Sequence, residues 1–121
     1  MIPSHIVHAY APPSVTTTDA TPTPIYNVEV PLNSLIEIAV EVRARRTSTF
    51  GASMFRRIYR VQNNAGTLTV LQEIAPVPDQ NANGYDVTIA VDDPTATATV
   101  SVTGASGHAV AWTLPGFSAT R

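Results

Sequence analysis

The sequence contains no cysteine and no lysine. Without cysteine, no disulfide, thiolate metal site or cysteine nucleophile can form. All seven basic residues are arginine, so the surface has fewer long flexible cations, which favours packing between subunits. Charged residues make up only 13% of the chain, against about 25% in ordinary soluble domains. Either another subunit covers part of the surface, or the chain is a stable β-protein that is simply rich in threonine and alanine.

Long hydrophobic runs are also missing. No apolar stretch approaches the roughly 20 residues that a membrane span needs. The first residues, MIPSHIVHAYAPP, have neither a basic start nor an apolar core, so we do not expect a secretory signal. The net charge of −2 gives no excess that would favour a nucleic-acid or membrane partner. A length of 121 residues suits one domain with a sizeable core.

The longest regular pattern in the chain is a strict alternation from Ser34 to Arg46. Aliphatic residues recur at every second position, and Glu37, Glu41 and two arginines occupy most positions between them. This period of two predicts a strand with one buried and one exposed face. A helical interpretation of 32–44 would separate the aliphatic residues onto different faces, so the strand is favoured.

Shorter alternating runs follow, separated by turns rich in Asn, Asp, Pro and Gly. The sequence therefore predicts an all-β protein, a single antiparallel β-sandwich of jelly-roll-like type with about seven strands and an extended N-terminal arm. We expect the arm at 1–15, the sandwich at 16–117 and a C-terminal tail at 118–121, with the chain leaving the sheet at Pro115. The predicted strands are 25–31, 34–46, 54–61, 67–74, 85–91, 96–103 and 108–114.

The expected arm is unusual because it is apolar. Its prolines oppose a helix or a central strand, yet solvated tails are usually polar. We therefore predict that the arm docks either on its own domain or on a neighbour. The residues expected to make that contact are Ile2, Ile6, Val7 and Tyr10.

Arginines gather at two places, the end of the long predicted strand and the middle of the next. Their acidic partners could lie across strands or across subunits. Weak pairs on solvated strand faces, an inter-subunit ion-pair network and nucleic-acid binding are the three interpretations. The candidate inter-subunit residues are Arg43, Arg45, Arg46, Arg56, Arg57, Glu37 and Glu41; Arg60 and Glu29 are further candidates for cross-strand or cross-subunit pairs.

The sequence predicts neither a catalytic nor a metal-binding site. His5 and His8 are three residues apart, but His108 is too distant in sequence to complete a metal site with them. Glu37 and Glu41 lie on one strand face with α-carbons about 13 Å apart, whereas a glycosidase pair needs carboxyls within about 9.5 Å. Ser106 does not match a nucleophile elbow. We therefore expect no enzyme activity and no cofactor.

Four short motifs occur in order along the chain. They are TTTDATPT at 16–23, a long strand that ends in Ala44-Arg45-Arg46, the group GYD at 84–86, and VTG at 102–104 followed by Trp112. In this order they resemble small β-domains of tailed-phage virion structural proteins, in which a TTDATPT-type lead-in precedes the first strand. The third motif has Tyr85 where those domains have tryptophan. The resemblance covers roughly 16–114.

This resemblance implies a non-enzymatic virion structural protein assembled in the host cytoplasm. A free-standing copy with an apolar arm would suit a capsid decoration, or cement, protein that stabilises the shell through subunit contacts. The partners implied are other copies of the chain, as a homotrimer, and the major capsid protein or other virion proteins. The alternative is a tail or fibre component that binds a host surface receptor through loops such as 47–53 and 79–84.

Overall fold

The computed structural model describes residues 14–48, 51–81 and 83–121. These residues form strands and turns, and no helix occurs among them. The strands are β1 (Ser14–Thr17), β2 (Thr23–Glu29), β3 (Ser34–Arg46), β4 (Ala52–Asn64), β5 (Thr67–Ile74), β6 (Gln80–Asn81), β7 (Asp86–Asp92), β8 (Thr97–Thr103) and β9 (Val110–Thr120). The predicted all-β class is confirmed. The two strands beyond the seven predicted are β1 and β6, which have four and two residues.

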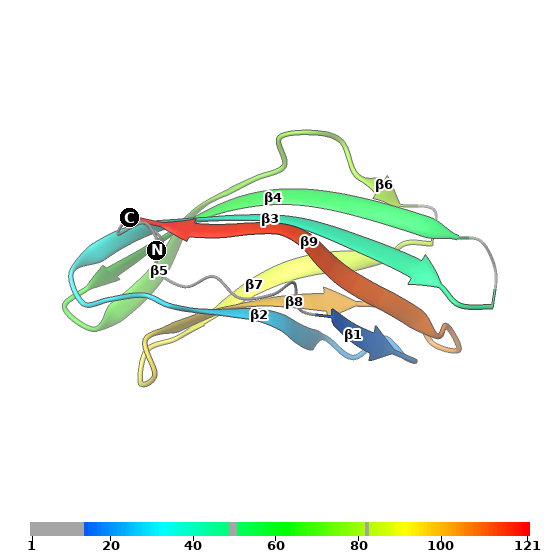
Figure 1. The fold of residues 1–121 in the computed structure, drawn as a ribbon. Helices are drawn as coiled ribbons and strands as arrows, with labels where there is room; N and C mark the ends of the chain where they lie inside the picture. The colour runs from blue at the N-terminus through cyan, green and yellow to red at the C-terminus, as the bar shows by residue number, and fades with distance from the viewer. Residues whose placement is uncertain (1–13, 49–50, 82) are drawn as a thin grey trace, which may run out of the picture.

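Two antiparallel sheets pack face to face as a β-sandwich (Figure 1). The larger sheet has the order β1-β9-β3-β4-β5, with β6 also paired to β4, and the smaller sheet has the order β2-β8-β7. In the larger sheet β9 returns to lie beside β3, the first strand of the β3-β4-β5 meander. Between β5 and β9 the chain forms β6, which pairs with β4, and then β7 and β8 of the smaller sheet.

The core lies between the sheets and is built mainly on β3 and β4, whose residues pair from Ser34↔Asn63 to Arg45↔Ala52. The alternating positions from Ile36 to Ala44 point inward, as predicted, and Ile36, Ile38 and Val42 are fully buried, whereas Leu35 is half exposed on the other face. Val100 and Val102 of β8, in the smaller sheet, are fully buried in the same core. Burial of this apolar area is the main favourable contribution to folding.

The predicted hairpin turn between β4 and β5 is present. Ala65 and Gly66 have positive φ values of 51° and 97°, as a two-residue hairpin turn requires. The buried Asn63 side chain holds the turn: its Oδ1 accepts a hydrogen bond from the Gly66 N–H at 3.0 Å, and its Nδ2 donates one to the Val30 carbonyl at 2.8 Å. One asparagine thus ties the hairpin to the end of β2.

The predicted end of the sheet was wrong. Strand β9 continues through Pro115 to Thr120, and residues 118–120 pair with β3 instead of forming a tail. The register shifts between Glu41 and Arg43, so a bulge in β9 accommodates the proline. Beyond the bulge, Phe117 packs on Tyr26 with ring centroids 5.1 Å apart. Proline marks the bulge and does not stop the strand.

The predicted start of the sandwich, at residue 16, was also wrong. Strand β1 begins at Ser14, inside the predicted arm of 1–15, and pairs antiparallel with β9 from Ser14↔Thr113 to Thr17↔Val110. The cause is local packing, because Val15 packs against the core and Thr17 is buried. The predicted turn at 79–84 likewise contains β6, which pairs with Ser53 and Met54 of β4.

Candidate interaction surface

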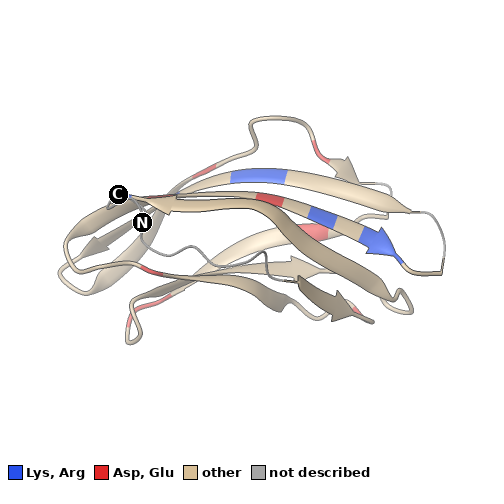
Figure 2. Ribbon diagram, viewed as in Figure 1, with Lys and Arg blue, Asp and Glu red and all other residues tan. Residues whose placement is uncertain are grey.

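The outer face of the larger sheet is the candidate interaction surface. It carries the outward residues of β9, which have mostly short side chains, and those of β3 and β4, which are mostly longer. It brings together many of the arginines and glutamates singled out in the sequence. Figure 2 shows basic residues on the strands of this sheet, whereas the smaller sheet and its turns carry acidic residues. The predicted arm contacts, Ile2, Ile6, Val7 and Tyr10, lie outside the described residues, as do His5 and His8.

Glu41 of β3 is shared by two arginines. Its Oε1 accepts hydrogen bonds from Nε and Nη2 of Arg56, directly opposite on β4, at 3.2 and 3.0 Å. Its Oε2 lies 2.9 Å from Nη2 of Arg43, two residues further along the same strand. One carboxylate therefore faces two guanidinium groups, and the cluster keeps a net positive charge.

Glu37, four residues before Glu41 on β3, makes a second cross-strand pair. Its Oε1 lies 3.3 Å from Nε of Arg60, the residue opposite, and Arg60 also donates a 2.8 Å hydrogen bond to Gln72 of β5. Exposed pairs of this kind contribute about 0–1 kcal/mol each to stability. The structure thus places both predicted glutamates in pairs within one chain. Their part in an inter-subunit network stays a prediction.

Arg57 does not belong to this face. It points inward from β4, and its side chain is only 10% exposed. Its Nη1 and Nη2 donate to the two carboxylate oxygens of Asp79 at 2.6 and 2.8 Å, and its guanidinium lies 5.7 Å from the Phe55 ring centroid. The hydrogen bond from Arg57 holds the pKa of Asp79 below its usual range and raises the pKa of the guanidinium.

Asp79 was not among the predicted partners. The signal that could have found it is the position of Arg57 between Phe55 and Tyr59 on the inward register of β4, because a buried arginine needs a carboxylate. Arg57 also fills a gap in the sheet: β5 pairs with β4 only from Ile58, and β6 pairs only up to Met54. In that gap its Nη1 donates to the Arg56 carbonyl at 3.0 Å.

Arg45 and Arg46 end β3 in different surroundings. Arg45 is exposed on the outer face and has no ion pair among the described residues, whereas Arg46 is half-buried with its Nε enclosed and unbonded. Of the predicted arginines, the structure therefore brings Arg43 and Arg56 together. It leaves Arg45 available for an external anion.

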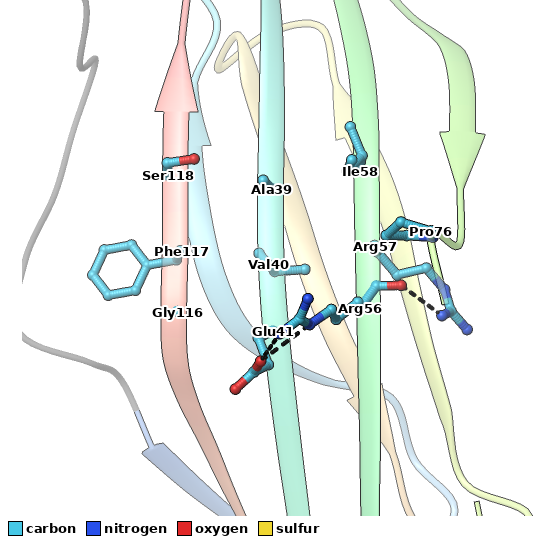
Figure 3. A pocket seen from close by; sticks show the side chains of 10 residues that line it. All are labelled: Ala39, Val40, Glu41, Arg56, Arg57, Ile58, Pro76, Gly116, Phe117 and Ser118. Atoms are coloured by element: carbon cyan, nitrogen blue, oxygen red, sulfur yellow. Dashed lines mark hydrogen bonds and ion pairs between the residues drawn. The ribbon is translucent and has the colours of Figure 1, made fainter. Parts of the chain in front are cut away.

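Of the hollows on the outer face, two lie beside arginines. The first, of about 330 Å³, lies over the middle of β9, β3 and β4 beside the Glu41–Arg56 pair (Figure 3). The second, of about 450 Å³, lies over the end of β3 where the arginines project. The second hollow is lined by Arg43, Ala44, Arg45, Ala52, Ser53, Met54, Gln80, Ala111 and Thr113.

The GYD and tryptophan motifs meet at one end of the core. The Tyr85 hydroxyl lies 2.8 Å from Nδ1 of His108, and its ring packs against Trp112. Trp112 Nε1 donates a 2.9 Å hydrogen bond to the Thr17 hydroxyl of β1. A Cβ on Gly104 would lie 2.8 Å from that same hydroxyl, so glycine is required there. These motif residues therefore connect β1 and β9 to the turn before β7.

Within 14–48, 51–81 and 83–121, no three His, Asp or Glu side chains gather closely enough to hold a metal ion. Ser106 lies exposed in the turn before β9, as expected for a turn residue. Among the described residues there is no membrane-crossing helix.

Comparison with known proteins leaves the chain without an assigned family. No family model matches it. No curated protein is similar enough to count as a relative.

Proposed function

We propose that this protein is a non-enzymatic structural component of a tailed-phage virion, and that it acts as a capsid decoration protein. In this role it binds the major capsid protein or other virion proteins as a homotrimer, and its N-terminal arm docks on neighbouring subunits. The stabilisation is mechanical, because each contact removes apolar area from water at a junction between subunits. The resemblance over 16–114 supports the proposal.

The structural observation that carries the proposal is the outer face of the larger sheet. Short side chains at Ala39 of β3 and at Gly116 and Ser118 of β9 leave the backbone of these two strands open to close approach by a partner. Guanidinium groups on the same face can make bidentate hydrogen bonds to carboxylates of a partner. A broad surface of this kind suits contact with another protein.

Removal of the arm tests the proposed role. A chain that lacks residues 1–13 should show reduced occupancy on purified particles, measured by quantitative gel analysis after sedimentation. A second variant, with Ile2, Ile6, Val7 and Tyr10 all replaced by serine, keeps the length of the arm and removes only its apolar surface. Equal occupancy of both variants and the wild type would refute the role assigned to the arm.

A tail or fibre component that binds a host receptor is the second candidate. The observation that favours it is the larger hollow, which is bordered by Ser53 and Gln80 from the two loops expected to bind such a receptor. Retention of the protein on host cell-wall fractions, lost on Arg45→Ala substitution, would support this candidate. The copy number per virion separates the two candidates, because a shell protein is present in far more copies than a tail protein.

A further inference from the structure

Charge is divided between the two outer faces of the sandwich. All seven arginines and nine acidic residues counted in the sequence lie within the described part of the chain. On the outer face of the larger sheet, four arginines accompany two glutamates: Arg43, Arg45, Arg56 and Arg60 with Glu37 and Glu41. We call this the basic face. Its excess charge is located at Arg45, which has no ion pair, and at the two arginines that share one glutamate.

The smaller sheet has the opposite character. Glu29 of β2, Thr97 of β8 and Asp92 of β7 pair in one row across the sheet, and both acidic residues are exposed. Since strands lie about 4.8 Å apart, the α-carbons of the two acids are on the order of 10 Å from each other on one face. None of the arginines lies on these three strands. We call this the acidic face.

Both faces allow close approach. Thr97 of β8 lies between the two acidic residues, and the other outward residues of β8 are threonines and a serine. The Thr99 hydroxyl donates a 2.8 Å hydrogen bond to the Asn27 side chain. The basic face is hollowed by about 450 Å³ beside Arg43 and Arg45, over alanines and a threonine. The acidic sheet surface therefore has a surface of opposite charge on the same molecule.

We propose that the basic face binds the acidic face of a second copy of this chain, with the guanidinium groups of Arg43 and Arg45 against the carboxylates of Glu29 and Asp92. Arginine suits this contact because its planar fork makes two parallel hydrogen bonds to a carboxylate. Complementary charge also accelerates encounter and sets the orientation of the partner. The larger hollow is then a self-association site and not a receptor pocket.

Such a contact is heterologous, because two different surfaces meet. Heterologous contacts close into a ring when the rotation between copies permits it and otherwise form an open stack. The proposed function includes self-association, and this inference rests on it because it specifies which surfaces make that contact. It assigns the contact to the two sheet faces and leaves the arm free to bind the particle.

Charge reversal on each face tests the proposal by sedimentation velocity on the full chain. At low ionic strength the wild type should associate, and added salt should weaken the association because exposed charges are screened. Arg45→Glu and Glu29→Arg should each raise the apparent dissociation constant at least about tenfold, since like charges would then face each other. An equimolar mixture of the two variants should associate again, because each retains the face that the other has lost.

The matched control is Arg121→Glu, which makes the same change in net charge at the last residue of the chain. It should leave the association unchanged. A wild type that stays monomeric at every concentration reached would overturn the proposal, and so would a mixture that associates no better than its components. Particle occupancy of the Arg45→Glu variant reports separately on the proposed function, since that variant retains the arm.

Discussion

At the scale of single residues, Arg57 places a charge on the inner face of β4 and Asp79 compensates it. The two side chains differ in exposure, 10% against 29%. Loss of the carboxylate leaves a cation without its partner in the interior, whereas loss of the guanidinium leaves an anion that water can reach. Removal of one member of a pair costs most when the remaining charge is buried.

We therefore expect Asp79→Ala to lower the free energy of unfolding by about 2–3 kcal/mol, and Arg57→Met to lower it by less. Glu73→Ala is the control, because its carboxylate is half-exposed and 3.9 Å from Arg57, and it should cost under about 1 kcal/mol. Urea denaturation followed by Trp112 fluorescence measures all three. Equal losses of unfolding free energy for Asp79→Ala and Glu73→Ala would contradict the assignment of Asp79 as the main partner of Arg57.

The same pair predicts a dependence on pH. The pKa of Asp79 is lower in the folded state than in the unfolded chain, where the pKa of aspartate is about 3.9. The unfolded chain therefore binds the proton more strongly. The stability contributed by Asp79 is thus fully present above about pH 4 and is lost as the pH falls through the folded pKa. Asp79→Asn should make the free energy of unfolding less dependent on pH in that acidic range and should not change its pH dependence near neutrality. Urea denaturation at a series of pH values measures this.

Tyr59 offers a contrast among the buried tyrosines. Its side chain is fully buried and its hydroxyl has no hydrogen-bond partner, and burial raises its pKa. Tyr59→Phe should therefore keep or slightly raise the free energy of unfolding, because a buried unsatisfied group is removed. Tyr85→Phe is the matched change, and it should cost about 1 kcal/mol because that hydroxyl bonds His108. Thermal melts measure both variants. A lower midpoint for Tyr59→Phe than for Tyr85→Phe would contradict this assignment of the two hydroxyls.

At the scale of strands, β9 is the element whose extent depends most on its surroundings. Past the bulge, Ala119 is fully buried and pairs with Ile38, while the adjacent Ser118 points to the outer face. Ala119→Asp should lower the free energy of unfolding by several kcal/mol, because an unpaired carboxylate would enter the core. Ser118→Asp should cost under about 1 kcal/mol. Similar effects of the two changes would mean that 118–120 are a tail after all.

At the scale of the whole molecule, the two sheets share one core, so they should unfold together. Ile38→Ala in the larger sheet and Val100→Ala in the smaller should each shift one common transition, the first by about 2–5 kcal/mol. Far-ultraviolet circular dichroism and Trp112 fluorescence should give the same midpoint for each variant. Separate midpoints would show that the sheets are independent units.

The division of charge between the sheet faces also belongs to the whole molecule. In the sequence, two glutamates precede three arginines along β3 and β4 carries only arginines as charged residues, but the sequence does not show which strands share a sheet. The division arises because β3 and β4 pair with each other, while Glu29 and Asp92 meet across β8 in the other sheet. The proposed association between copies depends on this tertiary arrangement.

The sequence by itself determined the β class, the inward face of β3 and the hairpin at 63–66, because alternation and turn chemistry act between near neighbours. Tertiary structure alone decided that β9 passes Pro115, that Arg57 meets Asp79 and that Arg45 lacks a partner. Each of these depends on which strand lies alongside, and strand pairing joins residues far apart in the chain. Local pattern specifies which face of a strand is buried, and only the assembled sheets specify what that face meets.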